Sequence, residues 1–199
     1  VGNFMVKIRK KARYVDYDKC TGCGICQEKC PRKVVDHDFE AGLGYRKAIY
    51  TPFPQAVPRI PVIDTANCTY FTRGKCQVCS KVCPTEAIDY EQKDEVIEIN
   101  VGNIVIATGW KLFDCERIPQ YGYKRLANVY TNMEFERLCN AAGPTNGKIV
   151  MRDGKTEPES VAIIHCVGSR DVNHNASCSS VCCMAALKFG HLVLEKTKA

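Results

Sequence analysis

The chain has 199 residues, of which 45% are hydrophobic and 25% are charged, and this is the composition of an ordinary globular protein. No apolar run approaches the length that a membrane-spanning helix needs, so we expect no membrane span. Fourteen cysteines would suit a secreted disulfide scaffold, but the sequence shows no signal peptide and is long for such a scaffold. We therefore expect free thiols in a reducing cytoplasm.

Residues 2–15 alternate around Val6 and Ile8 and predict a strand or hairpin arm with a solvated face. The basic run Lys7–Arg13 lies within this segment, and a solvated strand face explains it better than a docking patch does. No methionine opens the chain, which starts inside strand-like sequence, so we expect that the chain is a fragment or that its true beginning is missing.

Two cysteine runs follow and dominate the sequence. The first has the bacterial ferredoxin spacing, and the second has the same form with its first cysteine set further back. In this arrangement the fourth cysteine of each run ligates the cluster of the other run. We expect two [4Fe-4S] clusters with the following ligands: Cys20, Cys23, Cys26 and Cys83 for one, and Cys30, Cys68, Cys76 and Cys79 for the other.

The first cysteine loop contains two glycines that relax its backbone. Gly22 and Gly24 tolerate positive φ, so successive N–H groups can turn toward the cluster sulfides. Such a nest of amides favours an anionic centre.

Zinc is the main alternative metal, because it also uses C-x2-C pairs. Zinc sites rarely string three cysteines at this spacing before a proline, whereas the ferredoxin pattern accounts for all eight positions. An oxidised [4Fe-4S] cube with four thiolates carries about −2, so the formal net charge of +6 mostly compensates the cofactors. The basic balance therefore predicts no nucleic-acid partner.

The segment between Cys30 and Cys68 is longer than a minimal ferredoxin needs. Its residues 39–61 are rich in proline and aromatic side chains, and residues before proline favour extended backbone, so we expect an ordered wrapping loop. Thr85–Ile88 predicts a short helical turn, and Glu95–Ile99 alternates as a strand. The ferredoxin-like module is predicted to end near residue 93.

The second half of the chain changes character. Buried-type strands are predicted at 103–109 and 160–166, with a helix at 131–142 between them, which indicates an α/β domain with a largely parallel sheet. A nucleotide-binding unit would place G-x-G-x-x-G after such a strand, but residues 166–171 read Cys-Val-Gly-Ser-Arg-Asp. We predict no NAD site, which argues against a complete pyridine-nucleotide reductase.

A third group of cysteines lies in this half. A helix starting near Cys178 would place Cys178 and Cys182 on one face, beside Cys183. Cys166 ends the second predicted strand, where α/β sheets place their ligands. The four thiols could hold a third [4Fe-4S] cluster, or they could be buried or redox-active cysteines without metal. Spacing alone leaves the two interpretations equal.

Several motifs together resemble the A subunit of heterodisulfide reductase, and the likeness covers essentially the whole chain. The most specific parts are the proline-rich loop and the second-half cysteine motif, because ferredoxin repeats alone occur in many unrelated oxidoreductases. The segments that carry the resemblance are residues 19–26, 44–58, 107–109, 166–171 and 182–188.

The resemblance implies a ferredoxin module inserted into a thioredoxin-reductase-like flavin domain. Residues 1–15 would be a strand segment of the flavin domain, residues 16–93 the two-cluster module, and residues 94–199 a further part of the flavin domain. The fold class expected is thus an α+β ferredoxin-like module joined to part of an α/β domain. The resemblance also implies a third [4Fe-4S] cluster near the flavin, with these ligands: Cys166, Cys178, Cys182 and Cys183.

Bound FAD is a further implication of the resemblance. The turn formed by Ala107, Thr108 and Gly109 is similar to one that approaches FAD in such folds, and Lys188 is implied to reach toward the isoalloxazine, where a lysine could stabilise an anionic reduced flavin. The chain lacks the glycine fingerprint for the FAD pyrophosphate and the part that closes the flavin pocket. Alone, it should bind FAD poorly.

These expectations describe a segment of an oxidoreductase that passes electrons between FAD and partner proteins through [4Fe-4S] clusters. The resemblance implies a cytoplasmic, flavin-based, electron-bifurcating complex of the kind used in methanogenesis, with a homodimer of the complex as one option. Its partners would be other subunits and a hydrogenase, formate dehydrogenase or ferredoxin. We expect no catalytic residue on the segment, which alone should lack full activity.

A rival interpretation is a simple ferredoxin-like docking and electron-carrier module without flavin chemistry of its own. In that case the second-half cysteines would be structural. Cys115 and Cys139 match no ligand motif under either interpretation, and we expect them to be packing residues.

Overall fold

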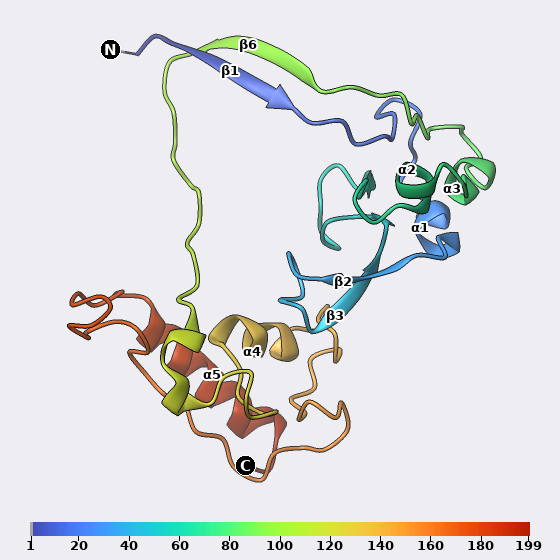
Figure 1. Ribbon diagram of the computed structural model, residues 1–199. Coiled ribbons are helices and arrows are strands. Elements are labelled where there is room, and N and C mark those ends of the chain that lie inside the picture. The colour runs from blue at the N-terminus through green and yellow to red at the C-terminus, as the bar shows by residue number, and fades with distance from the viewer. Residues whose placement is uncertain (1) are drawn as a thin grey trace. The chain divides into compact units, whose positions relative to one another are not determined.

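The computed structural model describes residues 2–199 and divides them into two compact units (Figure 1). The first unit comprises the residues before Asp36 together with Tyr45–Gly109. The second unit comprises Asp36–Gly44 and Trp110–Ala199. A short stretch from the middle of the ferredoxin-like sequence therefore belongs to the second unit.

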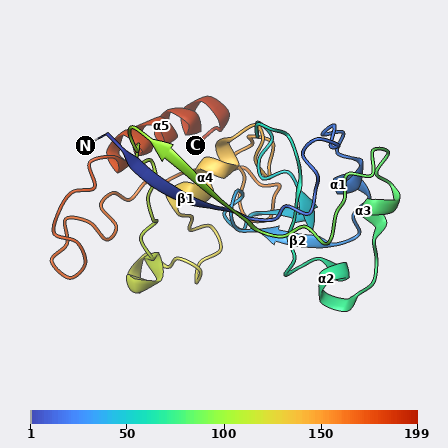
Figure 2. The same ribbon diagram turned by 90° about the horizontal axis from the view of Figure 1, so that it is seen from above.

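An antiparallel ribbon is the longest sheet structure of the first unit. β1 (Phe4–Lys10) pairs with β6 (Glu95–Val101), and Figures 1 and 2 show the two strands side by side. Val6 lies opposite Ile99, so apolar positions meet on the same face of the ribbon. Both strands that the alternation predicts are confirmed.

The basic residues of β1 face acidic residues across the ribbon. Lys7 Nζ lies 2.7 Å from Glu98 Oε1, and Arg9 Nη2 lies 2.6 Å from Asp94 Oδ2. These pairs are largely exposed, so each contributes little to stability. The basic run is a solvated strand face with its own counter-charges, as the sequence predicts.

Short elements build the cysteine-bearing part of the first unit. The helices are α1 (Ile25–Lys29), α2 (Thr69–Arg73) and α3 (Val78–Lys81). The strand pairs are β2 (Lys33–Asp36) with β3 (Gly44–Lys47), and β4 (Ile49–Tyr50) with β5 (Val62–Ile63). The apolar core beneath these elements includes Val15, Ile49, Ile60, Ile63 and Ala87.

Two local expectations for this part need correction. The predicted wrapping loop, residues 39–61, contains β3 and β4, because its prolines all follow Tyr50 and the earlier backbone keeps the N–H groups that strands need. The helical turn predicted at Thr85–Ile88 is wrong. Ile88 instead forms a β-bridge with Val15, which fits its place in the core.

Helices dominate the second unit. Among the residues described they are the 3-10 helices η1 (Cys115–Arg117) and η2 (Pro119–Tyr121) and the α-helices α4 (Asn132–Cys139) and α5 (Cys182–Lys196). Phe135 of α4 packs edge-on against Phe189 of α5, with ring centroids 5.4 Å apart. No helix within residues 2–199 is both long and apolar enough to cross a membrane.

A capping box fixes the start of α4. The Thr131 side chain accepts from the Glu134 backbone N–H at 3.2 Å, and Glu134 Oε2 accepts from the Thr131 N–H at 2.7 Å. The predicted helix at 131–142 is thus confirmed, although it ends at Cys139.

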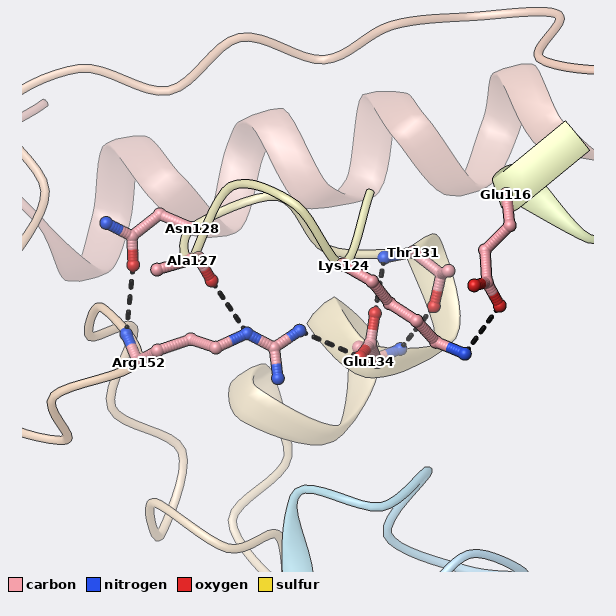
Figure 3. A network of polar contacts seen from close by, with 7 residues as sticks. All are labelled: Glu116, Lys124, Ala127, Asn128, Thr131, Glu134 and Arg152. Atoms are coloured by element: carbon pink, nitrogen blue, oxygen red, sulfur yellow. Dashed lines mark hydrogen bonds and ion pairs between the residues drawn. The ribbon is translucent and has the colours of Figure 1, made fainter. Parts of the chain in front are cut away.

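Glu134 also ties the preceding loop to a later one (Figure 3). The Arg152 guanidinium donates to Glu134 Oε1 at 2.9 Å and to the Ala127 carbonyl at 2.7 Å, and its backbone N–H donates to Asn128 Oδ1 at 3.1 Å. The same guanidinium lies over the Tyr130 ring, 4.6 Å from its centroid. One arginine therefore joins three parts of the second unit.

The predicted strands at 103–109 and 160–166 are absent, and the expected parallel sheet is absent with them. Both segments are irregular, and exposed fractions reach 89% at Val105 and 82% at Ile106. A strand needs a neighbouring strand for its N–H and C=O groups, and no strand within residues 2–199 pairs with either segment. The observed fold is a small α+β structure.

A buried ion pair joins the two stretches of the second unit. Arg137 Nη2 lies 3.0 Å from Glu40 Oε1, and the two side chains are only 8% and 11% exposed. The guanidinium also lies over the Phe39 ring, 4.1 Å from its centroid. Gly44 leaves room for this arrangement, because a Cβ there would meet the Glu40 side chain at 2.8 Å.

Replacing Arg137 by methionine should destabilise the second unit by about 3–5 kcal/mol, because it leaves the Glu40 carboxylate buried without a cation. Hydrogen exchange of the α4 amides and urea unfolding followed by circular dichroism would measure the loss. Lys124→Met is the matched control, since it removes a cation from an exposed pair with Glu116 (Figure 3) and should change little. Equal effects of the two substitutions would contradict the assignment.

Candidate metal centres

The first cysteine cavity lies in the first unit and has a volume of about 340 Å³, open space at its mouth included. The remaining lining is apolar or small, with Val15 and Ile25 among it. Cys26 is buried, whereas Cys23 is exposed at the rim. Four cysteines line this cavity: Cys20, Cys23, Cys26 and Cys83.

The second cysteine cavity has a similar volume, about 360 Å³, but its lining also includes Arg32 and Gln77. Ile49 and Ile63 supply apolar surface, and Tyr70 and Tyr90 add aromatic side chains. Its four cysteines are Cys30, Cys68, Cys76 and Cys79, of which Cys79 is buried and Cys76 exposed.

Each cysteine run contributes its last cysteine to the cavity that the other run mainly lines. Cys30 follows the first run but lines the second cavity, and Cys83 follows the second run but lines the first. Helices α1 and α3, which carry Cys26 and Cys79, pack against each other. The structure thus brings together the two sets of four that the sequence predicts.

The four thiols of each cavity are spread around its wall and do not converge on one point. No three His, Cys, Asp or Glu side chains of residues 2–199 come close enough to ligate a single metal ion. Around one zinc ion the sulfurs would each lie about 2.3 Å from the same point. A multi-atom cluster with one thiolate at each iron corner fits the arrangement better.

Left-handed residues shape the loops before α1 and α3. Gly24 caps α1 with a φ of 80°, and Gln77 caps α3 with a φ of 53°. Gly22 has a φ of 68°, and a Cβ there would lie 2.7 Å from the Arg59 carbonyl oxygen. The first loop therefore needs glycine at position 22 for both conformation and space.

Hydrogen bonds reach several of the sulfurs. The N–H of Gly22 donates to Cys20 Sγ at 3.4 Å, and the N–H of Ala87 donates to Cys83 Sγ at 3.3 Å. The Tyr90 hydroxyl lies 3.1 Å from Cys79 Sγ. Such bonds stabilise a thiolate and the negative charge of a cluster that it ligates.

Burial shifts the pKa values of the two most buried thiols of the cavities. Burial raises the pKa of Cys26 to about 11; the Gln27 N–H acts against the rise, and the thiols of Cys79, Cys20 and Cys23 add to it. Burial likewise raises the pKa of Cys79. A metal removes this penalty, because it replaces the proton and neutralises the thiolate.

Cys83 differs from these two thiols. Burial acts to raise its pKa, but hydrogen bonds from the Ala87 N–H and from Thr85 outweigh the burial and lower it. The backbone around Cys83 is therefore already arranged to hold a negative sulfur.

The third cysteine group lies in the second unit. Partial desolvation raises the pKa of Cys183, and the thiols of Cys182, Cys166 and Cys178 raise it further, so each of these three thiols lies near enough to act on Cys183. The Ser180 N–H donates to Cys178 Sγ at 3.4 Å. α5 begins at Cys182, so the expected helical face shared by Cys178 and Cys182 is wrong; a loop carries Cys178.

The residues implied in FAD binding belong to different units, Ala107–Gly109 to the first and Lys188 to the second. Ala107, Thr108 and Gly109 are exposed, and none of them lines either cysteine cavity. Lys188 Nζ lies 3.1 Å from Glu136 Oε2 in an ion pair between α5 and α4. Their part in FAD binding stays a prediction.

The remaining two cysteines pack in the second unit. Cys139 is buried beside Ile149 and Val193. Burial raises the pKa of Cys139 to about 11, and burial also raises the pKa of Cys115, with Asp114 and Glu134 adding to that rise. Neither thiol belongs to one of the three cysteine groups.

Sequence reasoning missed Tyr90 and Thr85, the two hydroxyl residues beside the ligand sulfurs. Both follow the second cysteine run closely, Thr85 directly after Pro84. No spacing rule marks them, because their role depends on where the loop after Cys83 returns to the core.

Comparison with known proteins shows to which class of domain the first cysteine run belongs. Residues 13–36 match the family of 4Fe-4S binding domains, so the first cysteine loop is of the ferredoxin type. This is the segment that carries the first three ligands of the first cavity and Cys30 of the second.

Over nearly its whole length, the chain is homologous to a segment of the A subunit of heterodisulfide reductase, as the motifs predict. It is 46% identical to the A subunit of the H(2):CoB-CoM heterodisulfide,ferredoxin reductase of Methanothermobacter thermautotrophicus and 48% identical to the iron-sulfur A subunit of the CoB-CoM heterodisulfide reductase of Methanocaldococcus jannaschii. It is 45% identical to the A subunit of the ferredoxin:CoB-CoM heterodisulfide reductase of Methanosarcina mazei. Each match covers 98% of the chain but only 29%, 29% and 24% of these relatives.

Gly22→Ala should damage the first cysteine cavity more than Gly24→Ala does. Both positions have positive φ, so alanine is strained at each by about 1–2 kcal/mol. Only at Gly22 does the new Cβ also meet a carbonyl, since a Cβ built at Gly24 would have no neighbouring atom within 4 Å. We expect a larger loss of bound iron per chain in G22A after anaerobic purification; equal iron in both variants would refute the role of Arg59.

Cys139 should react with iodoacetamide about a hundredfold more slowly at pH 8 than an ordinary cysteine, whose pKa is 9.0. Below both pKa values the thiolate fraction falls tenfold for each unit by which the pKa rises, and burial raises this pKa to about 11. Mass spectrometry of peptides after timed alkylation would measure the rate. In urea, where burial is lost, the rate should return to normal; a fast native rate would contradict the packing assignment.

Proposed function

We propose that the first unit holds two [4Fe-4S] clusters and transfers electrons through them. The observation that carries the proposal is the crossed arrangement of eight cysteines around two neighbouring apolar cavities. The ligands are Cys20, Cys23, Cys26 and Cys83 for one cluster and Cys30, Cys68, Cys76 and Cys79 for the other. Bound there, each cluster supplies a one-electron redox couple.

The protein contributes burial, hydrogen bonds and access to these couples. Cys26 and Cys79 lie in the core of the unit, where apolar surroundings disfavour added negative charge. Backbone N–H groups and the Tyr90 hydroxyl, which lie at the sulfurs, instead stabilise added negative charge. Cys23 and Cys76 are exposed, so each cavity has an edge that a partner protein could approach.

A third [4Fe-4S] cluster in the second unit is part of the proposal. The electrostatic neighbourhood of its four thiols supports it, and so does the N–H donated to Cys178 Sγ. Its ligands would be Cys166, Cys178, Cys182 and Cys183. This site is open, since Cys178 and Cys183 are exposed.

The relatives support membership in a larger electron-transfer complex. They are named as subunits of reductases that act on the CoB-CoM heterodisulfide, and two of the names include ferredoxin. We propose that this segment carries electrons within such a cytoplasmic, flavin-based complex, between other subunits and a hydrogenase, formate dehydrogenase or ferredoxin. FAD would need surfaces beyond those described, with Ala107–Gly109 and Lys188 contributing to them.

Two observations favour the simpler carrier. Residues 110–199 of the second unit contain no strand, and Lys188 is engaged by Glu136. In that case the first unit alone would exchange electrons with partners, and the second unit would support it without a cofactor.

Iron and acid-labile sulfide counted per chain distinguish these functions. Wild type purified without oxygen should contain about twelve iron atoms, and Cys182→Ser about eight, because each cluster holds four. Cys139→Ser is the matched control and should keep about twelve, since Cys139 is a packing residue. Eight iron atoms in both wild type and Cys182→Ser would remove the third cluster and leave the simpler carrier; no iron in wild type would refute the proposal as a whole.

A further inference from the structure

Tyr90 is the one side chain outside the ligand set whose oxygen touches a ligand sulfur of the second cysteine cavity, within the hydrogen bonds described for residues 2–199. Its hydroxyl oxygen lies 3.1 Å from Cys79 Sγ, and the residue lines that cavity. A cysteine that ligates iron is a thiolate and has no hydrogen to donate. In the metal-bound protein Tyr90 must therefore be the donor and Cys79 the acceptor.

Packing fixes the phenol in this position. The Tyr90 ring lies against Tyr70, with centroids 4.0 Å apart, and meets Phe71 edge-on at 5.9 Å. Phe71 in turn packs on Tyr14, with centroids 4.6 Å apart. Because the ring cannot swing away without disturbing this aromatic group, the hydroxyl is held toward the sulfur.

The first cysteine cavity has no tyrosine in its lining. Its nearest equivalent is Thr85, whose hydroxyl lies 3.7 Å from Cys83 Sγ and is therefore a weaker partner. The two cavities share ligand type and ligand number, and the Tyr90 phenol is one chemical difference between them; Arg32 and Gln77, which also line only the second cavity, are others. Hydrogen bonds to cluster sulfurs are one of the means by which proteins set cluster potentials.

We propose that Tyr90 raises the reduction potential of the cluster held by Cys30, Cys68, Cys76 and Cys79 through its hydrogen bond to Cys79 Sγ. This inference rests on the proposed two-cluster function. The added electron increases the negative charge on the sulfurs, so the reduced state gains more from the donated hydrogen than the oxidised state does. The couple involves one electron and no proton, because the hydroxyl hydrogen stays on Tyr90.

The experiment is a redox titration of the full chain, purified without oxygen and followed by electron paramagnetic resonance. Tyr90→Phe keeps the ring and removes the hydroxyl. The affinity of one cluster for an electron should fall about tenfold, which for a one-electron couple is about 59 mV toward negative values, while the other potentials stay.

Two matched controls accompany it. Tyr70→Phe removes a hydroxyl from the same cavity that makes no hydrogen bond to sulfur among those described, so no potential should move. Thr85→Val should shift a different cluster from the one that Tyr90→Phe shifts, and by less, because its hydroxyl is further from the sulfur.

Unchanged potentials in Tyr90→Phe, with all clusters present, would overturn the inference and leave the proposed function standing. Wild type without iron would instead refute the proposed function. If Tyr90→Phe does not assemble its clusters, fluorotyrosine at position 90 provides the test. A more acidic phenol is a stronger donor and should raise the same potential, and no change there would overturn the inference.

Discussion

The crowding of eight thiols into two apolar cavities is the constraint on which the first unit depends. Cys26 and Cys79 are themselves part of its core, and four more ligand cysteines pack against that core. As thiolates without metal they would repel one another in a place that disfavours charge, which is why burial and neighbouring sulfurs raise the pKa of Cys26. A cluster bound there, as proposed, would reverse this balance, because its iron would neutralise the thiolates and crosslink the chain. A unit with so few other buried apolar residues would then gain part of its core from the proposed cofactors.

The crossed arrangement of the cysteines joins parts of the chain that are distant in sequence, and the surrounding backbone is arranged to match. Before the first run, the N–H groups of Arg13 and Tyr14 both donate to Gln92, at 2.9 and 2.6 Å. The Asp16 N–H donates to the Ala87 carbonyl at 2.7 Å. The ribbon of β1 and β6 continues this closure outward. The beginning and end of the ferredoxin-like module are therefore held together by the backbone as well as by the ligands.

The second unit is held together in a different way. Its apolar cluster is small, and much of its order comes from buried or half-buried arginines that pair with glutamates, as Arg137 does with Glu40 and Arg152 with Glu134. Removing one partner of such a pair is costly, because the remaining charge stays away from water. The segment that supplies Glu40 comes from the middle of the ferredoxin-like sequence, so the two sequence regions cannot be assigned to separate units by position alone.

The sequence by itself determined the division of eight cysteines into two crossed sets, the ribbon strands and α4, because cysteine spacing, alternation and a capping box are local patterns. It could not determine whether residues 103–109 and 160–166 form strands, since apolar runs become strands only where a neighbouring strand accepts their hydrogen bonds. Likewise, only the tertiary structure placed the Tyr90 hydroxyl on Cys79 and paired Glu40 with Arg137. Those contacts depend on how segments distant in sequence pack against each other, and the residue spacing within one segment does not predict that packing.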